Sequence, residues 1–390
     1  MSESIYLDHA ATTPVRSEVL EAMLPFLGAR FGNPSSVHRW GRDARVALDE
    51  ARETIAHALG AHADEICFTS GGTEGDNFAI LGAWRAARAT RPVVVSTPIE
   101  HKAVLEAVHR VVHEGGDERL VPVTSDGLVE PLAFASAMDA RVAVASVMWI
   151  NNEVGVVQPV EALGEIARAH GALFHTDAVQ ALGKVAIDTA SQPVDLLTLS
   201  GHKIGAPKGI GALYIRRGVQ VDPLLHGGGQ DRGRRPGTEN VAFAVGLARA
   251  VTLAAAERRT HVDEWAALRD ALEAAILDAV PDAVIHGRGA PRAPHIVNVS
   301  LPGTDSESML MALDLRGIAC SAGSACQSGS ISVSHVLSAM GVSPTLAASA
   351  LRLSLGSMND AHTPSRVAEA LGALVQKARA PRAAAMVEAW

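Results

Sequence analysis

Polar side chains with catalytic potential follow the ends of several apolar runs in the chain. Lys203 follows one such run in the string SGHK, and Asp177 and Gln180 close a second run in HTDAVQ. Two further runs lead to His101 in IEHKAV and to Asn152 in WINNEVG. An amine, a carboxylate, an imidazole and two amides could together bind a polar cofactor and move protons.

A phosphate group would fit the turn in the string TSGGTE. Gly71, Gly72 and Thr73 lie where an apolar run changes into a helical pattern, and they offer backbone N–H groups and a hydroxyl to an anion. Ser200 and His202 flank the lysine motif and could add further phosphate contacts. These residue types therefore favour a phosphorylated ligand.

Pyridoxal phosphate has groups that match all of these side chains. Its aldehyde fits Lys203, which is one of only five lysines in the chain, and its pyridine nitrogen fits a carboxylate such as Asp177. A carboxylate there keeps the ring nitrogen protonated, so that the ring accepts electrons from a carbanion at the substrate Cα. The combination predicts a pyridoxal phosphate site and no metal site.

Each of these residues, taken alone, also fits a plain structural role. Lys203 could be a solvated lysine at a strand end, and Asp177 could cap a helix. Asn152 could form a turn, and His101 could lie on the surface in the first turn of a helix. Only their joint occurrence favours the catalytic interpretation.

From about residue 65, predicted β-strands alternate with predicted helices along the chain, and these elements would position the residues above. Helical patterns between the strands cover about 73–89, 100–115 and 159–171. The alternation predicts an α/β fold with a mainly parallel sheet and helices on both faces, and ligands in such sheets bind at the carboxyl ends of the strands. The predicted strands are 65–69, 92–97, 141–149, 172–177, 195–200 and 211–217.

The character of the sequence changes near residue 250. A long Ala-rich helical stretch is typical of a connector, and the segments after it suggest a compact α+β domain. The first dozen residues are too short for a domain, so we expect them to join the second one. The predicted division is a large cofactor-binding domain at 14–255 and a small domain at 1–13 and 256–390, with a mobile cysteine loop at about 321–334.

Composition excludes several classes of protein. The 390 residues are 48 % apolar and 19 % charged, which excludes disorder, and a net charge of −8 without a basic cluster argues against a nucleic-acid groove. No stretch is apolar enough for a membrane span, and the acidic start MSES does not fit a signal peptide. Three cysteines cannot form a disulfide framework, so we expect a cytoplasmic protein.

Ten strings that run in order from residue 6 to residue 356 resemble the NifS/IscS-type cysteine desulfurases. This family consists of fold-type-I pyridoxal phosphate enzymes close to the class V aminotransferases. The resemblance implies the same fold for this chain, with a large domain and a smaller α+β domain. The strings are YLDHAATTP, FGNPSS, FTSGGTEGDN, EHKAVL, NNEVGVVQPV, HTDAVQALGK, SGHKIGAPKGIGALY, GGGQDRGRRPGTEN, SAGSACQSGS and RLSLG.

The resemblance also implies roles for individual residues. Lys203 matches the Schiff-base lysine, Asp177 matches the partner of the ring nitrogen, and His101 matches the histidine that stacks on the ring and shuttles protons. The remaining matches are Asn152 and Gln180 at the 3-hydroxyl oxygen, Gly72, Thr73, Ser200 and His202 at the phosphate, Thr238 at the phosphate of the other subunit in a homodimer, and Asn33 and Arg352 at the substrate α-carboxylate.

The chemistry of this family requires a nucleophilic thiol. Cys67 lies in the predicted strand EICFT and Cys320 ends the strand-like string GIAC, so we expect both to be buried. Cys326 lies in SAGSACQSGS, a string of small uncharged residues, and it matches the family's reactive cysteine. A free thiol has a pKa of about 8.5 and must be activated, and His101 is a candidate to accept its proton.

The resemblance predicts that the chain converts L-cysteine to L-alanine and stores the sulfur as a persulfide on Cys326. An acceptor protein, either an iron–sulfur scaffold or a thiolation enzyme, would then take the sulfur. Two alternatives remain at this point. One is a selenocysteine lyase or another class V enzyme such as an aminotransferase, and the other is a sulfur-relay protein without the cofactor.

Overall fold

A seven-stranded sheet forms the centre of the computed structural model, which describes residues 4–322 and 333–380. Its strand order is β2-β8-β7-β6-β5-β3-β4, and the five strands from β7 to β4 are all parallel. The prediction of a mainly parallel sheet is confirmed. The strands are β2 (Ile66–Thr69), β3 (Val93–Ser96), β4 (Asp117–Leu120), β5 (Val142–Ser146), β6 (Leu173–Asp177), β7 (Leu196–Ser200) and β8 (Gly211–Ile215).

The strand β8 differs from the rest because it pairs antiparallel with both β7 and β2. The connection from Ser200 to Gly211 is too short for the crossover of a dozen or more residues that a parallel neighbour needs. It instead forms a tight loop that begins with the short helix η3 (Gly201–Lys203). This loop holds the lysine motif at the carboxyl end of β7.

Helices cover both faces of this sheet, and the central strands are accordingly apolar. All five residues of β5 are buried, as expected for a parallel strand with helices on both sides. The helices that follow the sheet strands or precede β2 are α1 (Ser17–Leu27), α2 (Arg39–Leu59), η1 (Ala63–Glu65), α3 (Gly72–Asn77), η2 (Phe78–Gly82), α4 (Ala83–Ala87), α5 (Lys102–His113), α6 (Pro131–Ala137) and α7 (Val160–Ala169).

The predicted helix at 73–89 is divided into three pieces in the structure. The helix α3 gives way to the π-helical turn η2 and then to α4. All five residues of η2 are buried. At Gly82 a Cβ atom would approach the carbonyl oxygen of Asp222 to 2.7 Å, so only glycine allows this packing without a shift.

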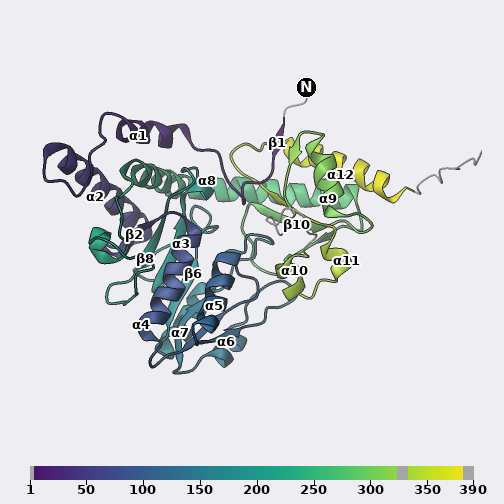
Figure 1. Ribbon diagram of the computed structural model, residues 1–390. Coiled ribbons are helices and arrows are strands. Elements are labelled where there is room, and N and C mark those ends of the chain that lie inside the picture. The colour runs from purple at the N-terminus through teal and green to yellow at the C-terminus, as the bar shows by residue number, and fades with distance from the viewer. Residues whose placement is uncertain (1–3, 323–332, 381–390) are drawn as a thin grey trace, which may run out of the picture.

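The long helix α8 (Val241–Ala279) joins two hydrophobic cores, and Figure 1 shows it crossing from the seven-stranded sheet toward α12. Its residues Leu247 and Val251 pack in the core of that sheet, whereas Leu272 and Ile276 pack in a second core. The connector predicted near residue 250 is therefore present. The short helix η4 (Gln230–Gly233) precedes α8.

The second core surrounds an antiparallel sheet of order β12-β10-β9 and a parallel pair of β1 with β11. Because Ile5 pairs with Ile318, the N-terminal residues pack with the carboxyl-terminal part of the chain. The exact limits of two domains stay a prediction. The elements are β1 (Ile5–Tyr6), β9 (Val284–Ile285), β10 (Ile296–Ser300), α9 (Ser306–Asp314), β11 (Ile318–Ala319), α10 (His335–Ala339), α11 (Pro344–Ala347), β12 (Ala350–Ser354) and α12 (Thr363–Arg379).

No helix in the described part of the chain is long and apolar enough to cross a membrane.

Candidate active site

The structure brings most of the predicted cofactor residues to one edge of the central sheet. Asp177 is the last residue of β6 and Ser200 is the last residue of β7, and these two strands are parallel neighbours. Asn152 follows β5, and His101 caps the first turn of α5 after β3. The carboxyl ends of adjacent parallel strands meet at one edge, which is where ligands bind in such sheets.

Lys203 emerges in η3, directly after β7, and its amine faces the N-terminal segment, which we define as residues 8–13. The amine Nζ donates hydrogen bonds to the carbonyl oxygens of Ala10 at 2.6 Å and Ala11 at 2.8 Å. Gln180 Nε2 donates to the same carbonyl of Ala10 at 2.8 Å. The N-terminal segment therefore joins two of the predicted cofactor residues.

Burial lowers the pKa of Lys203 to about 8, and the nearby Arg352 guanidinium acts in the same direction. On burial the ammonium form loses its hydration free energy, and hydrogen bonds to carbonyl groups replace only part of it. A lowered pKa leaves a larger neutral fraction of the amine near neutral pH. The neutral amine is the form that can act as a nucleophile or as a base.

Asp177 and His101 influence each other electrostatically at the strand ends. The Asp177 carboxylate is buried, and its Oδ1 accepts a hydrogen bond from the backbone N–H of Val179 at 2.9 Å. Burial raises the pKa of Asp177, while attraction to His101 and to Lys203 opposes that rise. A cationic partner such as a protonated ring nitrogen would keep this carboxylate ionised in the same way.

The His101 side chain accepts a hydrogen bond at Nδ1 from the backbone N–H of Ala103, at 3.1 Å. In the neutral imidazole, Nε2 therefore carries the proton. The residue is solvent-exposed at its edge, yet desolvation by the surrounding groups lowers the pKa of His101, and attraction to Asp177 opposes this. The ring is therefore exposed and influenced by the buried Asp177 carboxylate, and its role as a proton carrier stays a prediction.

A polar network that the sequence analysis missed lies beneath Asp177. His175 is fully buried and contacts Ser146 Oγ at 2.8 Å and Thr198 Oγ1 at 2.9 Å. Its Nε2 also lies 3.7 Å from the buried carboxylate of Asp76. Burial lowers the pKa of His175 to about 3, so the ring is neutral. The polar residues of HTD and TLS inside apolar strands are the signal that could have revealed this network.

The predicted phosphate residues are only partly gathered together. Gly71 has φ +152°, a conformation that favours glycine, and an added Cβ would lie 3.8 Å from Ser200 Oγ. The turn that contains Gly72 thus packs beside the end of β7, and the neighbouring Thr73 is exposed. The His202 ring contacts Thr12 Oγ1 at 3.2 Å, and burial lowers the pKa of His202 to about 4, which makes the ring neutral.

Thr238 does not share a cavity with the lysine motif in this chain. It is exposed and lines a cavity of about 200 Å³ together with Ser70 and Arg235. Neither Lys203 nor His202 lines that cavity. A role for Thr238 in the site of this same chain is therefore not supported by its position, whereas a role in a neighbouring subunit stays a prediction.

Arg352 lies in the middle of β12 and reaches across to the sheet edge. Its Nη1 donates to the backbone oxygen of Asn152 at 2.9 Å, and its Nη2 forms an ion pair with Asp8 at 2.8 Å. The residue is buried, and its Nε has no hydrogen-bond partner among the described residues. An unpaired buried guanidinium N–H is a donor that a carboxylate could use.

Asn33 is not brought to Arg352 within this chain. It lies on the loop between α1 and α2, is exposed, and accepts a hydrogen bond from the backbone N–H of Ser35 at 2.9 Å. Figure 1 places this loop on the far side of the molecule from β10, which is the neighbour of β12. This arrangement does not support binding of one substrate carboxylate by Asn33 and Arg352 of the same chain.

The two described cysteines are poor nucleophiles. Cys67 is fully buried in β2, and burial raises the pKa of its thiol well above the usual range. Cys320 is half-buried after β11, and burial raises the pKa of its thiol to about 12. The expected burial is complete for Cys67 and partial for Cys320. Cys326, the predicted nucleophile, lies outside the described residues.

The residues that follow the undescribed segment are attached to the strand-end loops. Ser334 Oγ donates to the Glu153 carboxylate at 2.5 Å, and both side chains are buried. His335 Nε2 donates to the backbone oxygen of Glu100 at 2.9 Å, which is adjacent to His101. These contacts hold residues 334 and 335 beside the loops that follow β3 and β5.

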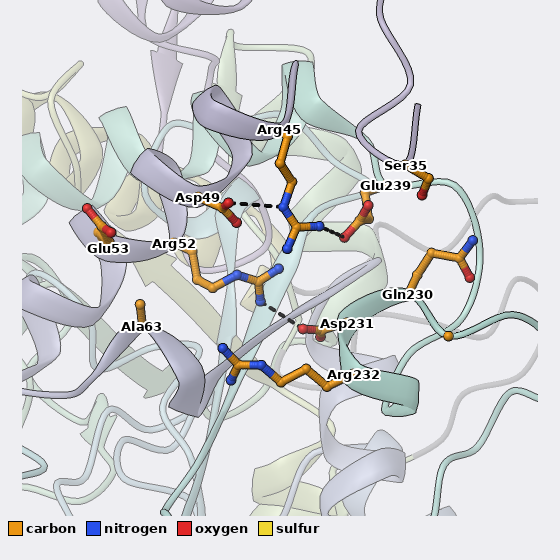
Figure 2. A pocket seen from close by; sticks show the side chains of 11 residues that line it. Ser35, Arg45, Asp49, Arg52, Glu53, Ala63, Gln230, Asp231, Arg232 and Glu239 are labelled. Atoms are coloured by element: carbon orange, nitrogen blue, oxygen red, sulfur yellow. Dashed lines mark hydrogen bonds and ion pairs between the residues drawn. The ribbon is translucent and has the colours of Figure 1, made fainter. Parts of the chain in front are cut away.

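A different, strongly charged pocket is shown in Figure 2. It has a volume of about 560 Å³ and lies between α2 and the loop around η4. Figure 2 shows Arg52 pointing toward Asp231, and this buried ion pair measures 2.9 Å. None of the predicted cofactor residues lines the pocket, so we do not assign the cofactor to it.

Comparison with known proteins shows the family of the chain. The aminotransferase class-V family model matches residues 5–363. The chain is 45 % identical to cysteine desulfurase IscS of Methanosarcina thermophila, over 97 % of this chain and 93 % of the relative. It is 46 % identical to cysteine desulfurase NifS of Azotobacter vinelandii, over 90 % and 87 %.

Solved structures show the same fold. A NifS-like protein superposes with a TM-score of 0.90 at 35 % identity, and the match covers 96 % of this chain and all of that one. The structure of SspA in complex with cysteine matches with a TM-score of 0.81 at 34 % identity, over 90 % and 99 %. The resemblance to the NifS/IscS-type enzymes is confirmed, and the chain belongs to the aminotransferase class-V family.

Proposed function

We propose that this chain is a pyridoxal phosphate-dependent cysteine desulfurase, which releases L-alanine from L-cysteine and transfers the sulfur to Cys326. The observation that supports this most strongly is the arrangement of Lys203, Asp177 and His101 at one sheet edge. The names of its relatives, cysteine desulfurases at 42–46 % identity over nearly the whole chain, point to the same reaction.

The donor set fits pyridoxal phosphate. A buried carboxylate, an amine of lowered pKa and a glycine turn beside a serine hydroxyl match its ring nitrogen, aldehyde and phosphate. When bound, the cofactor supplies an electron sink that stabilises negative charge at the substrate Cα. The residues proposed to hold it are Lys203, Asp177, His101, Asn152, Gln180, Gly72, Thr73, Ser200, His202 and Thr238 of the partner subunit.

The protein's own residues provide the proton movements. The Lys203 amine, with its pKa lowered to about 8, can take a proton from the substrate Cα. The His101 side chain is exposed, and its Nε2–H can give a proton to the substrate. To accept the proton of the Cys326 thiol at Nε2, the ring must first carry its own proton on Nδ1, which gives up the hydrogen bond from Ala103. A thiolate is the reactive form of cysteine, so this proton transfer would activate the nucleophile.

Arg352 is proposed to bind the substrate carboxylate through its unpaired Nε–H, while its other nitrogens hold Asn152 and Asp8. These two contacts fix the guanidinium plane before substrate arrives. Asn33 is proposed to bind the substrate carboxylate only as a residue contributed by a neighbouring chain. The two described thiols stay outside the reaction because burial holds their pKa values high.

The experiment that tests this function measures alanine and sulfide from L-cysteine, with the cofactor and a thiol reductant added and without any keto acid. The reductant cleaves the persulfide on Cys326, so that its outer sulfur leaves as sulfide. A desulfurase releases both products under these conditions. Dependence of turnover on a keto acid would instead identify an aminotransferase, and activity confined to selenocysteine would identify a selenocysteine lyase. A chain that does not acquire the cofactor's visible absorption would point to a sulfur-relay protein.

The proposal also covers the oligomeric state, the sulfur acceptor and the cellular compartment. We infer a homodimer in which the arm around Thr238 reaches a neighbouring site, and a sulfur acceptor that is an iron–sulfur scaffold or a thiolation enzyme. The cytoplasm is the proposed compartment. Light scattering at the assay concentration tests the dimer, and transfer of labelled sulfur to candidate acceptors tests the partner.

A further inference from the structure

Another cavity is lined by Lys203 but not by Asp177. It has a volume of about 90 Å³ and is bounded by the N-terminal segment, by η3 and by the middle of α8. Lys203, Lys184, His9 and His295 all line it, whereas His101 and Asp177 do not. A volume near 30 Å³ per water gives room for about three waters or for one small ion with water.

Two of the lining side chains are buried and have polar atoms without partners among the described residues. His295 is only 2 % exposed, and neither of its ring nitrogens has a hydrogen-bond partner among the described residues. His9 is 5 % exposed, and its Nε2 is likewise unpaired. Buried polar atoms without partners are costly, so groups of this kind indicate a ligand or ordered water.

The His9 ring is fixed in this position by close packing. A Cβ added at Gly356 would come within 2.4 Å of His9 Nδ1, so glycine is required where β12 leaves the sheet. The ring also makes an edge contact with Tyr6, at 4.9 Å between centroids. The unpaired nitrogen of His9 therefore cannot easily turn away to find water elsewhere.

Lys184 adds a positive charge without a carboxylate partner. It is 8 % exposed, and its Nζ donates one long hydrogen bond of 3.4 Å to the backbone oxygen of Lys203. The one carboxylate among the residues that line the cavity, Glu257, is held by Arg16 at 2.5 Å and 3.0 Å. Buried charges in proteins are normally paired, so the cavity lacks a negative charge.

We propose that this cavity binds a small monovalent anion of halide size, held by the Lys184 ammonium and by N–H groups of His9 and His295. Each neutral imidazole can present one N–H to the anion, and Lys184 can present the donors that the Lys203 carbonyl does not use. The anion would neutralise the buried charge beside Lys203. The proposal does not depend on the reaction, because it concerns binding to the folded chain.

The test compares the melting temperature of the full chain, with its cofactor bound, in sodium bromide and in sodium gluconate at the same ionic strength. Because bromide binds only the folded state, a bromide concentration about ten times the Kd raises the folded-to-unfolded ratio about elevenfold. We expect this gain in the parent chain and in Lys377→Met, an exposed lysine in the last turn of α12. We expect no gain in Lys184→Met.

A crystal soaked in bromide provides a readout that does not require a variant to fold. The proposal predicts an anomalous peak in contact with Lys184 Nζ. Equal stabilisation of the parent chain and Lys184→Met, or of neither, would overturn it. A bromide-soaked crystal without a peak at Lys184 would overturn it as well.

Discussion

Replacing Ser334 by alanine tests whether the chain that follows the Cys326 segment is fixed to the active-site edge. The Ser334 hydroxyl donates to the buried Glu153 carboxylate at 2.5 Å and accepts the Leu337 N–H at 3.1 Å as the cap of α10. Loss of the cap costs about 1 kcal/mol, and loss of a hydrogen bond to a charged group costs about 1.5–3 kcal/mol. The local loss is therefore about 2.5–4 kcal/mol.

Hydrogen exchange of the α10 amides measures this loss directly. At 1.4 kcal/mol per factor of ten, exchange should become about 60-fold to 700-fold faster in Ser334→Ala. Ser338→Ala is the matched control, because its exposed hydroxyl makes only a hydrogen bond of 2.9 Å to the backbone oxygen of Ser334 within the same helix. Exchange rates that are equal in Ser334→Ala and in the parent chain would refute the reasoning.

We expect Ser334→Ala to reduce alanine release without reducing cofactor binding. Cofactor binding should stay intact because Lys203 and Asp177 make no contact with Ser334 in the structure described here. Alanine release should fall, because the segment that holds Cys326 loses its fixed end. A variant with faster exchange in α10 but unchanged alanine release would show that this attachment does not serve sulfur transfer.

Three further predictions concern the sheet edge. Lys203→Ala should lose the visible absorption of the bound cofactor and all activity, and Lys208→Ala should keep both; borohydride trapping of a lysine other than Lys203 would contradict this. Because the pKa of Lys203 is lowered to about 8, the rate of cofactor uptake by the apo chain should be low at acidic pH, rise with a midpoint near pH 8 and then level off. A midpoint above pH 10 would contradict this, since it is the value of an ordinary exposed lysine. Arg352→Ala should raise the KM for cysteine about 10-fold to 100-fold, from a lost charge-assisted contact of about 1.5–3 kcal/mol; an unchanged KM would remove Arg352 from substrate binding.

The sequence predicts the strand ends well because the parallel strands are buried on both faces. In runs such as 141–149 most residues are apolar, so the end of the run lies close to the edge of the sheet, although β5 itself ends at Ser146, three residues before the predicted limit. The edge strand β4 was not predicted, since its sequence DERL is charged and exposed. Polar edge strands carry little hydrophobic signal.

The parts of the site that depend on distant contacts could not be read from the sequence. The carbonyls of Ala10 and Ala11 that hold Lys203 lie more than 190 residues earlier in the chain. The Asp8–Arg352 ion pair joins residues that are 344 positions apart. Backbone carbonyls have no side-chain signature, so only the folded structure reveals these partners.

The roles of Thr238 and Asn33 also depend on tertiary contacts that the sequence does not show. Thr238 and Asn33 match family positions by their strings, yet Lys203 does not line the cavity of Thr238, and Figure 1 draws the loop between α1 and α2, which carries Asn33, away from β10. The proposed homodimer, in which a neighbouring subunit completes the site, would account for this difference. Such completion cannot be deduced from one sequence, because the chain itself does not indicate which copy presents a residue.

The central claim is that sulfur from L-cysteine is transferred to Cys326, and mass spectrometry of the chain after one turnover tests it most directly. The prediction is one added sulfur atom on the peptide that contains Cys326, formed together with one alanine. Cys67→Ser and Cys320→Ser should give the same result, whereas Cys326→Ser should bind the cofactor and release no alanine above background. Sulfur found on Cys320, or alanine formed by Cys326→Ser at the parent rate, would contradict the account.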